Sequence, residues 1–198
     1  MADPGVLGAV LAGGRSTRMG TPKALVELAG RVLISYPLAA LTEAGFEAIV
    51  VAKPDSPLPP LECRVVREPA EPVHPLCGVV AALGAAEDRA VIALGCDMPL
   101  VPPTLLVWLA TLDADAAVPE LGGRMQPLLA RYEPIVAPAL EAAIKRGDSA
   151  TDAVAGLDPR VLTEAELSRF GNPELIALNV NTSADLERAA ALLDSDDR

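Results

Sequence analysis

The stretch Val6-Leu-Gly-Ala-Val-Leu-Ala-Gly-Gly-Arg-Ser-Thr-Arg-Met-Gly-Thr-Pro-Lys23 joins an apolar run to a glycine-rich loop. The apolar run, residues 6–11, predicts a buried strand. The loop after it carries three glycines and three cations: Gly13, Gly14, Gly20, Arg15, Arg18 and Lys23. No acidic residue occurs from position 4 to position 26, in a chain of net charge −11. Flexible backbone N–H groups and concentrated positive charge predict a cradle for a polyphosphate; the alternative is an ordinary strand-to-helix turn with solvated cations.

Two common phosphate-binding loops do not match this stretch. The Walker loop requires a hydroxyl residue directly after its lysine, but Ala24 follows Lys23. The dinucleotide fingerprint Gly-x-Gly-x-x-Gly is also absent. The loop therefore belongs to another class of phosphate site.

The spacing of the loop resembles the nucleotidyltransferase signature Leu-x-Gly-Gly-x-x-x-Arg-Met-Gly-x-x-Lys, here residues 11–23. More closely, it is similar to the molybdenum cofactor guanylyltransferases (MobA-like) and their cytidylyltransferase relatives. This resemblance implies that the backbone of Leu11, Ala12 and Gly13 lies along the nucleobase. It also implies that Gly14, Arg15, Arg18 and Lys23 hold the triphosphate. Guanylyl enzymes resemble Leu-Ala-Gly-Gly here and cytidylyl relatives Leu-Ala-Ala-Gly, so Gly13 favours guanine.

Composition excludes several other classes of protein. With 198 residues, 51% of them hydrophobic and 3% aromatic, the chain predicts one packed α/β domain spanning residues 1–198. The acidic balance argues against nucleic-acid binding. The three cysteines and single histidine (Cys63, Cys77, Cys96 and His74) are too scattered for a zinc site. We expect no secretory leader, no membrane span and a cytoplasmic location.

The first half of the chain alternates strands and helices. Apolar runs predict strands at residues 6–11, 46–52, 62–67 and 90–95, with a short extended piece at 24–28. Helices are predicted at 32–44, bent by Pro37, at 76–86 and at 104–112. Such alternation predicts a three-layer α/β/α fold around a mostly parallel, Rossmann-like sheet, and the resemblance implies the nucleotide-diphospho-sugar transferase type. Residues 1–112 would form the nucleotide-binding half.

The second half, residues 113–194, is expected to bind the acceptor. Gly122-Gly123 predicts a hairpin between strands at 114–119 and 124–132. Helices are expected at 135–146, 151–155 and 164–169. A last strand is expected at 176–180, and a helix at 183–193 with Ser183 as its N-cap.

Asp97 follows the strand at 90–95 directly. Ligands of parallel sheets bind beyond the carboxyl ends of the strands, so Asp97 is expected beside the glycine-rich loop. Mg²⁺ prefers a protein carboxylate together with phosphate oxygens, and the family's Asp-x-Pro segment, which holds magnesium, matches Asp97-Met-Pro99. The alternative is a helix cap or a solvated carboxylate.

Three polar residues of the second half are candidates for acceptor binding. The family shows Asn-Val-Asn-Thr near its end, and this chain has Asn179-Val-Asn-Thr182. By resemblance, Asn181 lies near the metal and the acceptor phosphate; an Asx turn into the last helix is the alternative. Gln126 lies in a segment that resembles the acceptor-side strand.

The chain departs from the family at two positions that often show Asn and Asp contacting the nucleotide. Ala52-Lys53 stands at the first position, and either Glu68 or Glu71 at the second. His74 lies in a proline-rich loop and is assigned no catalytic role.

Taken together, the resemblance implies Mg²⁺-dependent transfer of GMP from GTP to molybdopterin bearing molybdenum, with release of pyrophosphate. Arg18, Lys23 and Asp97 would be the catalytic residues. Transient contact with molybdoenzyme maturation proteins would follow from this role. Alternatives are cytidylyl transfer, a sugar-phosphate or phospholactate acceptor, and a non-catalytic nucleotide-binding or cofactor-chaperone protein.

Overall fold

A single sheet runs through both halves of the computed structural model, which describes residues 5–14 and 22–196. The strand order is β10-β7-β9-β6-β1-β4-β5, with β8 paired to β7. The strands are β1 (Val6–Leu11), β4 (Glu47–Ala52), β5 (Arg64–Arg67), β6 (Ala90–Gly95), β7 (Ala116–Leu121), β8 (Arg124–Met125), β9 (Leu129–Tyr132) and β10 (Arg160–Leu162). Strands β1, β4, β5 and β6 are parallel, whereas β9 is antiparallel to β6 and β7. The predicted mostly parallel sheet is confirmed.

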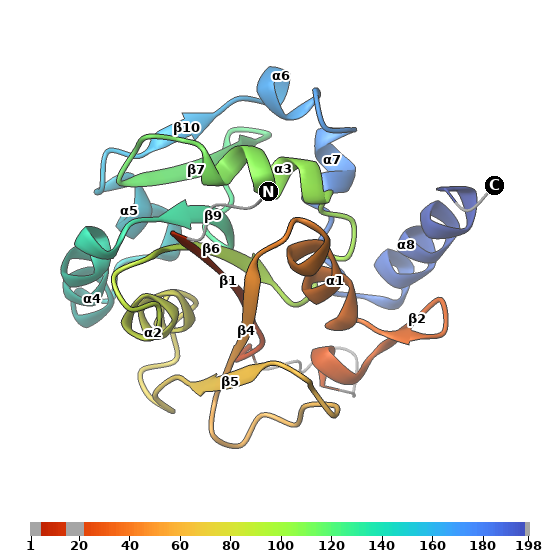
Figure 1. Ribbon diagram of the computed structural model, residues 1–198, viewed down its shortest axis with the longest axis horizontal. Coiled ribbons are helices and arrows are strands. Elements are labelled where there is room, and N and C mark those ends of the chain that lie inside the picture. Colours follow the sequence, from red (N-terminus) through yellow and green to blue (C-terminus); the bar gives the residue numbers. More distant parts are fainter. Residues whose placement is uncertain (1–4, 15–21, 197–198) are drawn as a thin grey trace.

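Alternating side chains of β1 divide the interior into two apolar clusters. Val6 and Val10 belong to the cluster under α1 (Ser35–Glu43) and α3 (Pro103–Ala110). Leu7 and Ala9 belong to the cluster under α2 (Cys77–Ala85), α4 (Ala137–Arg146) and α5 (Ala150–Ala155). Successive strand residues point to opposite faces, so a fully buried strand needs helices on both sides. Figure 1 shows these helix layers on the two sides of the sheet.

The C-terminal helix packs away from the main sheet. The two-stranded hairpin of β2 (Glu27–Leu28) and β3 (Arg31–Val32) forms a third apolar cluster with α8 (Ser183–Asp196). Figure 1 shows α8 and this hairpin together on the right of the molecule. None of the helices in the described ranges is both long and apolar enough to cross a membrane.

Several predicted elements have other limits or another form. Residues 24–28 include the 3₁₀ turn η1 (Lys23–Leu25) before β2, and α1 begins at Ser35, which puts Pro37 in its first turn rather than at a bend. The predicted strand at 124–132 is split into β8 and β9. β10 was not predicted, and the helix predicted at 135–146 opens with the 3₁₀ turn η2 (Pro134–Val136).

The predicted Gly122-Gly123 hairpin is confirmed, because both glycines have positive φ angles, 55° and 70°. Such angles suit the tight turns that match the twist of paired strands. The predicted short helix at 164–169 corresponds to α6 (Glu164–Leu167).

The strand predicted at 176–180 was wrong. The helix α7 (Pro173–Ile176) occupies the start of this segment, with Pro173 in its first turn and Asn172 as its N-cap. These two residue types favour a helix start, and they outweighed the apolar run that follows. The prediction of Ser183 as an N-cap was also wrong. The Thr182 hydroxyl accepts from the Asp185 N–H at 3.2 Å, and the Asp185 carboxylate accepts from the Thr182 N–H at 2.9 Å, which makes Thr182 the cap.

Candidate functional site

Four parallel strands end at one edge of the sheet and deliver the site residues there. The loop of residues 12–14 follows β1, Lys53 follows β4, Glu68 follows β5 and Asp97 lies two residues beyond β6. Backbone bonds join these loops, since the Ala12 N–H donates to Val51 at 2.8 Å and the Cys96 N–H to Leu11 at 3.1 Å. The chain thus places the glycine-rich loop and Asp97 side by side, as the sequence predicted.

Two adjoining cavities of about 390 and 240 Å³ open at this edge. Gly13, Gly14, Lys23 and Lys53 line both of them. The larger cavity extends over the loop of residues 54–57, and the smaller one reaches Glu68, His74, Gly78, Asp97 and Leu128. The combined space is in the usual size range of ligand sites.

The Lys23 ammonium lies at the centre of the site. Its Nζ donates to Asp97 Oδ2 at 2.5 Å and to Asn181 Oδ1 at 2.6 Å. These partners lie 74 and 158 residues away along the chain. The side chains of Lys23 and Asp97 are only 21% and 16% exposed, so this ion pair is partly shielded from water.

Asn181 reaches Lys23 because the segment before α8 is tied to the loop that carries Asp97. The Val180 N–H donates to the Asp97 carbonyl at 2.9 Å. The Asn181 N–H donates to Asp185 Oδ2 at 3.0 Å. The backbone N–H of Asn181 and the Thr182 hydroxyl hold the pKa of Asp185 below its ordinary value. The N-terminus of α8 therefore fixes the position of Asn181.

The donor set at Lys23 fits a magnesium ion. The Lys23 ammonium shows that two oxygens, one from a carboxylate and one from an amide, converge on a single cation. Mg²⁺ takes oxygen ligands and commonly uses one or two carboxylates, substrate phosphates and waters. No cluster of three or more His, Cys, Asp or Glu side chains suited to a metal occurs among the described residues.

The other predicted site residues divide into three groups. Leu11, Ala12, Gly13 and Gly14 line the two cavities. Arg15 and Arg18 lie outside the described residues. Asn179 donates to Ala177 at 2.9 Å and Gln126 to Arg124 at 3.2 Å, so each amide stabilises its own turn. Their predicted contact with an acceptor stays a prediction.

Lys53 and Glu68 form a second charged pair, which the sequence placed near the nucleotide without a role. Lys53 Nζ lies 3.8 Å from Glu68 Oε1, and the Glu68 side chain is only 5% exposed. Burial raises the pKa of Glu68, whereas the charge of Lys53 lowers it. Their positions directly after β4 and β5 were the signal that could have assigned both residues to the site.

His74 and Cys96 line the smaller cavity. The His74 ring is held by two hydrogen bonds, and the Cys96 side chain is buried. The Leu76 N–H donates to His74 Nδ1 at 3.2 Å, so the ring donates from Nε2 to the Asp148 carbonyl at 2.9 Å. Burial raises the pKa of Cys96 to about 12, and a protonated thiol is a poor nucleophile. The two hydrogen bonds fix the ring of His74, to which the sequence assigned no catalytic role.

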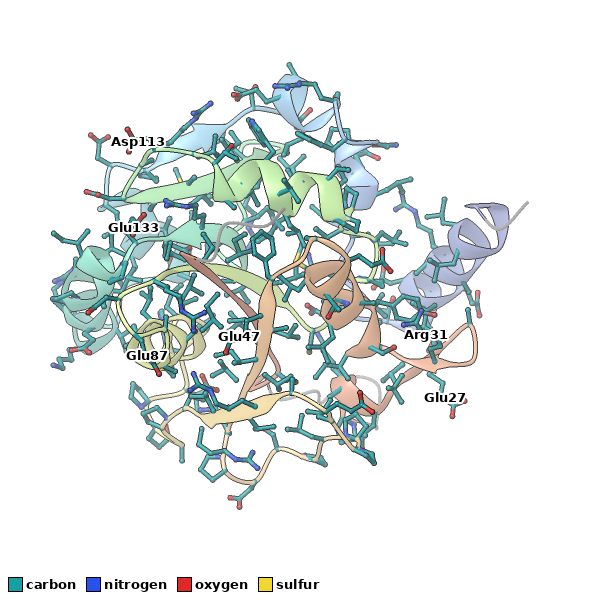
Figure 2. The ribbon with its side chains drawn as sticks, viewed as in Figure 1. Glu27, Arg31, Glu47, Glu87, Asp113 and Glu133 are labelled. Carbon is teal, nitrogen blue, oxygen red and sulfur yellow. The ribbon has the colours of Figure 1, made fainter. Side chains whose placement is uncertain are left out.

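Carboxylates occur at both edges of the sheet. Glu47 begins β4, Glu87 precedes β6, Asp113 precedes β7, and Glu133 follows the antiparallel β9. All four carboxylates therefore belong to the edge opposite Lys23, and Figure 2 shows them on the left-hand half of the molecule. At the edge of Lys23, two lysines (Lys23 and Lys53) line the cavities together with four acidic residues: Asp55, Glu68, Glu71 and Asp97.

Comparisons with known proteins agree with this geometry. The family model described as the MobA-like NTP transferase domain matches residues 8–161. Proteins named probable molybdenum cofactor guanylyltransferase are 32% identical in Carboxydothermus hydrogenoformans, over 91% of this chain and 92% of the relative, and 31% identical in Pelotomaculum thermopropionicum, over 95% and 93%. The crystal structure of molybdopterin-guanine dinucleotide biosynthesis protein A from Archaeoglobus fulgidus superposes with a TM-score of 0.80 at 27% identity, covering 95% of this chain and 98% of that one.

Proposed function

Because the chain belongs to the MobA-like NTP transferase family and is a nucleotidyltransferase, we propose that it transfers GMP from GTP to molybdenum-bearing molybdopterin. The observation that carries this proposal is the convergence of Lys23, Asp97 and Asn181 beside the glycine loop. The names of the relatives, probable molybdenum cofactor guanylyltransferase, support guanine as the base and molybdopterin as the acceptor.

In the proposed reaction, an acceptor phosphate oxygen attacks the α-phosphorus of GTP. A new P–O bond forms as the bond to the β-phosphate oxygen breaks, and pyrophosphate leaves with the electron pair. The attacking phosphate is already an anion at neutral pH, so no general base is required. Catalysis then depends on positioning and on compensation of negative charge.

Lys23 and the glycine loop would supply much of this positioning and charge compensation from the protein. The backbone of residues 11–14 would lie along the base and the phosphates, and Lys23 would donate to the triphosphate. Asp97 and Asn181 would hold Mg²⁺, which when bound neutralises charge on the reacting phosphates. Lys23 forms an ion pair with Asp97 in this structure. When the nucleotide binds, the Lys23 ammonium would donate to its phosphates instead.

The division of labour between the two halves is part of the same proposal. Residues 1–112 would bind the nucleotide and residues 113–194 the acceptor, with Asn179 and Gln126 on the acceptor side. Three free cysteines support a reducing, cytoplasmic compartment. Transient contact with molybdoenzyme maturation proteins would deliver the product.

The test is turnover with purified molybdenum-bearing molybdopterin, Mg²⁺ and each of GTP, CTP, ATP and UTP. We expect pyrophosphate release with GTP, well above the rates with the other three nucleotides. Faster turnover with CTP would assign the chain to the cytidylyl relatives. Tight nucleotide binding without pyrophosphate release would favour a non-catalytic binding protein.

A further inference from the structure

We propose that Lys53 is a positioning residue, which holds the Glu68–Ala70 loop against the glycine loop and so shapes the nucleotide pocket. This inference rests on the proposed function, because it concerns the same pocket. It goes beyond the family resemblance, which assigns no role to Lys53.

The ammonium of Lys53 contacts one short loop, residues 68–70. Its Nζ donates to the Pro69 carbonyl at 3.1 Å and to the Ala70 carbonyl at 2.9 Å, and lies 3.8 Å from Glu68 Oε1. The ammonium thus makes two hydrogen bonds and one longer ion pair with this loop. The side chain is only 13% exposed. These contacts are all with the loop of residues 68–70, so Lys53 is expected to act through that loop.

The backbone on both sides of this contact is also joined. The Glu68 N–H donates to the Ala52 carbonyl at 3.1 Å, and the Arg67 guanidinium donates to the Lys53 carbonyl at 2.9 Å. These bonds connect the end of β4 to the end of β5. They do not use the Lys53 side chain, so a substitution there would release chiefly the Glu68 carboxylate and the backbone of residues 69 and 70.

The position of this loop matters because Glu68 fills the space beside two glycines. A Cβ atom on Gly13 would lie 1.7 Å from Glu68 Oε1, and one on Gly78 would lie 3.2 Å from Glu68 Oε2. The carboxylate therefore packs directly against the backbone that is expected to follow the base. Lys53 compensates the charge of this buried carboxylate, and without it Glu68 would be an unpaired buried anion.

Lys53 also stands where the two cavities meet. It is one of the four residues that line both cavities, with Gly13, Gly14 and Lys23. Loss of the Lys53 contacts would widen the junction between the two cavities and weaken the binding of the nucleotide. Among the described residues, Lys53 makes no hydrogen bond or ion pair with Lys23, Asp97 or Asn181. The proposed reacting centre would therefore keep its geometry.

The experiment compares Lys53→Met with Lys53→Arg and with Lys145→Met, in which an exposed lysine of α4 is lost. For each variant we would measure the Kd of the nucleotide that binds wild type most tightly, KM and kcat of turnover, and the melting temperature. We expect K53M to raise Kd and KM about tenfold, with kcat within about twofold, as for loss of binding shared by ground and transition states. K53R should restore most of the affinity, since a guanidinium can donate to the same carbonyls, and K145M should match wild type.

Equal affinity of K53M and wild type would overturn the proposal. So would a parallel fall of kcat and melting temperature without a change in Kd, which would indicate only a structural role. Should K53M not fold, Lys53→Gln is used, whose amide can still donate to one carbonyl; it should show an intermediate loss, and wild-type affinity would overturn the proposal. Because the nucleotide is chosen by affinity, a preference for CTP would contradict the proposed function without affecting this test.

Discussion

Two lysines line the same cavities, and their surroundings differ in kind. Lys23 contacts a carboxylate and an amide from segments 74 and 158 residues away. Lys53 donates to backbone carbonyls 16 and 17 residues away and lies 3.8 Å from the Glu68 carboxylate. Lys23 therefore joins three separate segments of the chain, whereas Lys53 joins the end of β4 to one neighbouring loop. This difference distinguishes the proposed reacting centre at Lys23 from the proposed supporting contacts of Lys53.

Loss of the carboxylate at the reacting centre should have the largest effect. Asp97→Ala removes the charged partner of Lys23, and the Asp97 backbone carbonyl can still accept from the Val180 N–H. We expect pyrophosphate release to fall by ~10³-fold or more, the order seen when a preorganised charge is removed. The circular dichroism spectrum should be unchanged. Turnover within tenfold of wild type would remove Asp97 from the proposed metal site.

Replacement of Lys23 should lower turnover and raise affinity for a metal. Lys23→Met should reduce turnover by ~10²-fold, because the triphosphate loses a cation. In the absence of nucleotide, the same variant should bind Mn²⁺ more tightly than wild type, because no ammonium competes for Asp97 and Asn181. Titration followed by electron paramagnetic resonance measures this affinity.

Lys53→Met is the matched control for that titration, since it removes the same charge from the same cavities. Its Mn²⁺ affinity should equal that of wild type. If both variants gained affinity equally, general electrostatics and not exchange at Lys23 would be the cause.

Adding a methyl group between Glu68 and the glycine loop should have an intermediate effect, on stability. In Gly13→Ala the new Cβ would lie 1.7 Å from Glu68 Oε1, so the loop or the carboxylate must move. Overpacking of this kind costs about 1–3 kcal/mol, which urea unfolding measures. Adding Glu68→Ala to G13A should recover most of this loss, and failure to recover it would place the strain elsewhere.

The smallest expected effect concerns the pH dependence of stability. Burial raises the pKa of Glu68 above its ordinary value of 4.5, although Lys53 opposes this, and Cys77 is the other titratable group in electrostatic contact. The folded state thus favours the protonated carboxyl. This contribution to stability is complete below pH 4.5 and is lost as the pH rises through the folded-state pKa.

Glu68→Gln should therefore gain melting temperature relative to wild type as the pH is raised from 4 to 7. A difference of 1 kcal/mol corresponds to about 2–4 °C in a protein of this size. Glu141→Gln, which changes a half-exposed carboxylate on α4, is the control and should show no such trend. A gain for E68Q that is largest at low pH would contradict the assignment.

Much of the sheet, and the edge at which its loops meet, could be predicted from residue patterns. The buried run before Gly13 and the buried run before Asp97 both become parallel strands, so their following loops meet at one edge. The segment of residues 176–180 could not be assigned in this way. Its apolar residues suit a strand, but the Val180 N–H bonds to the loop that carries Asp97 instead of to a strand.

The sequence by itself determined the alternation of strands and helices, the glycine loop and the sheet edge at which Lys23 and Asp97 meet. These follow from hydrophobic periodicity and from short-range rules about where loops leave a parallel sheet. Only the tertiary structure decided that Asn181 reaches Lys23 and that Lys53 supports Glu68 against Gly13. Such contacts depend on which polar groups remain unpaired after the sheet has formed, and that is a property of the packed chain rather than of any one segment.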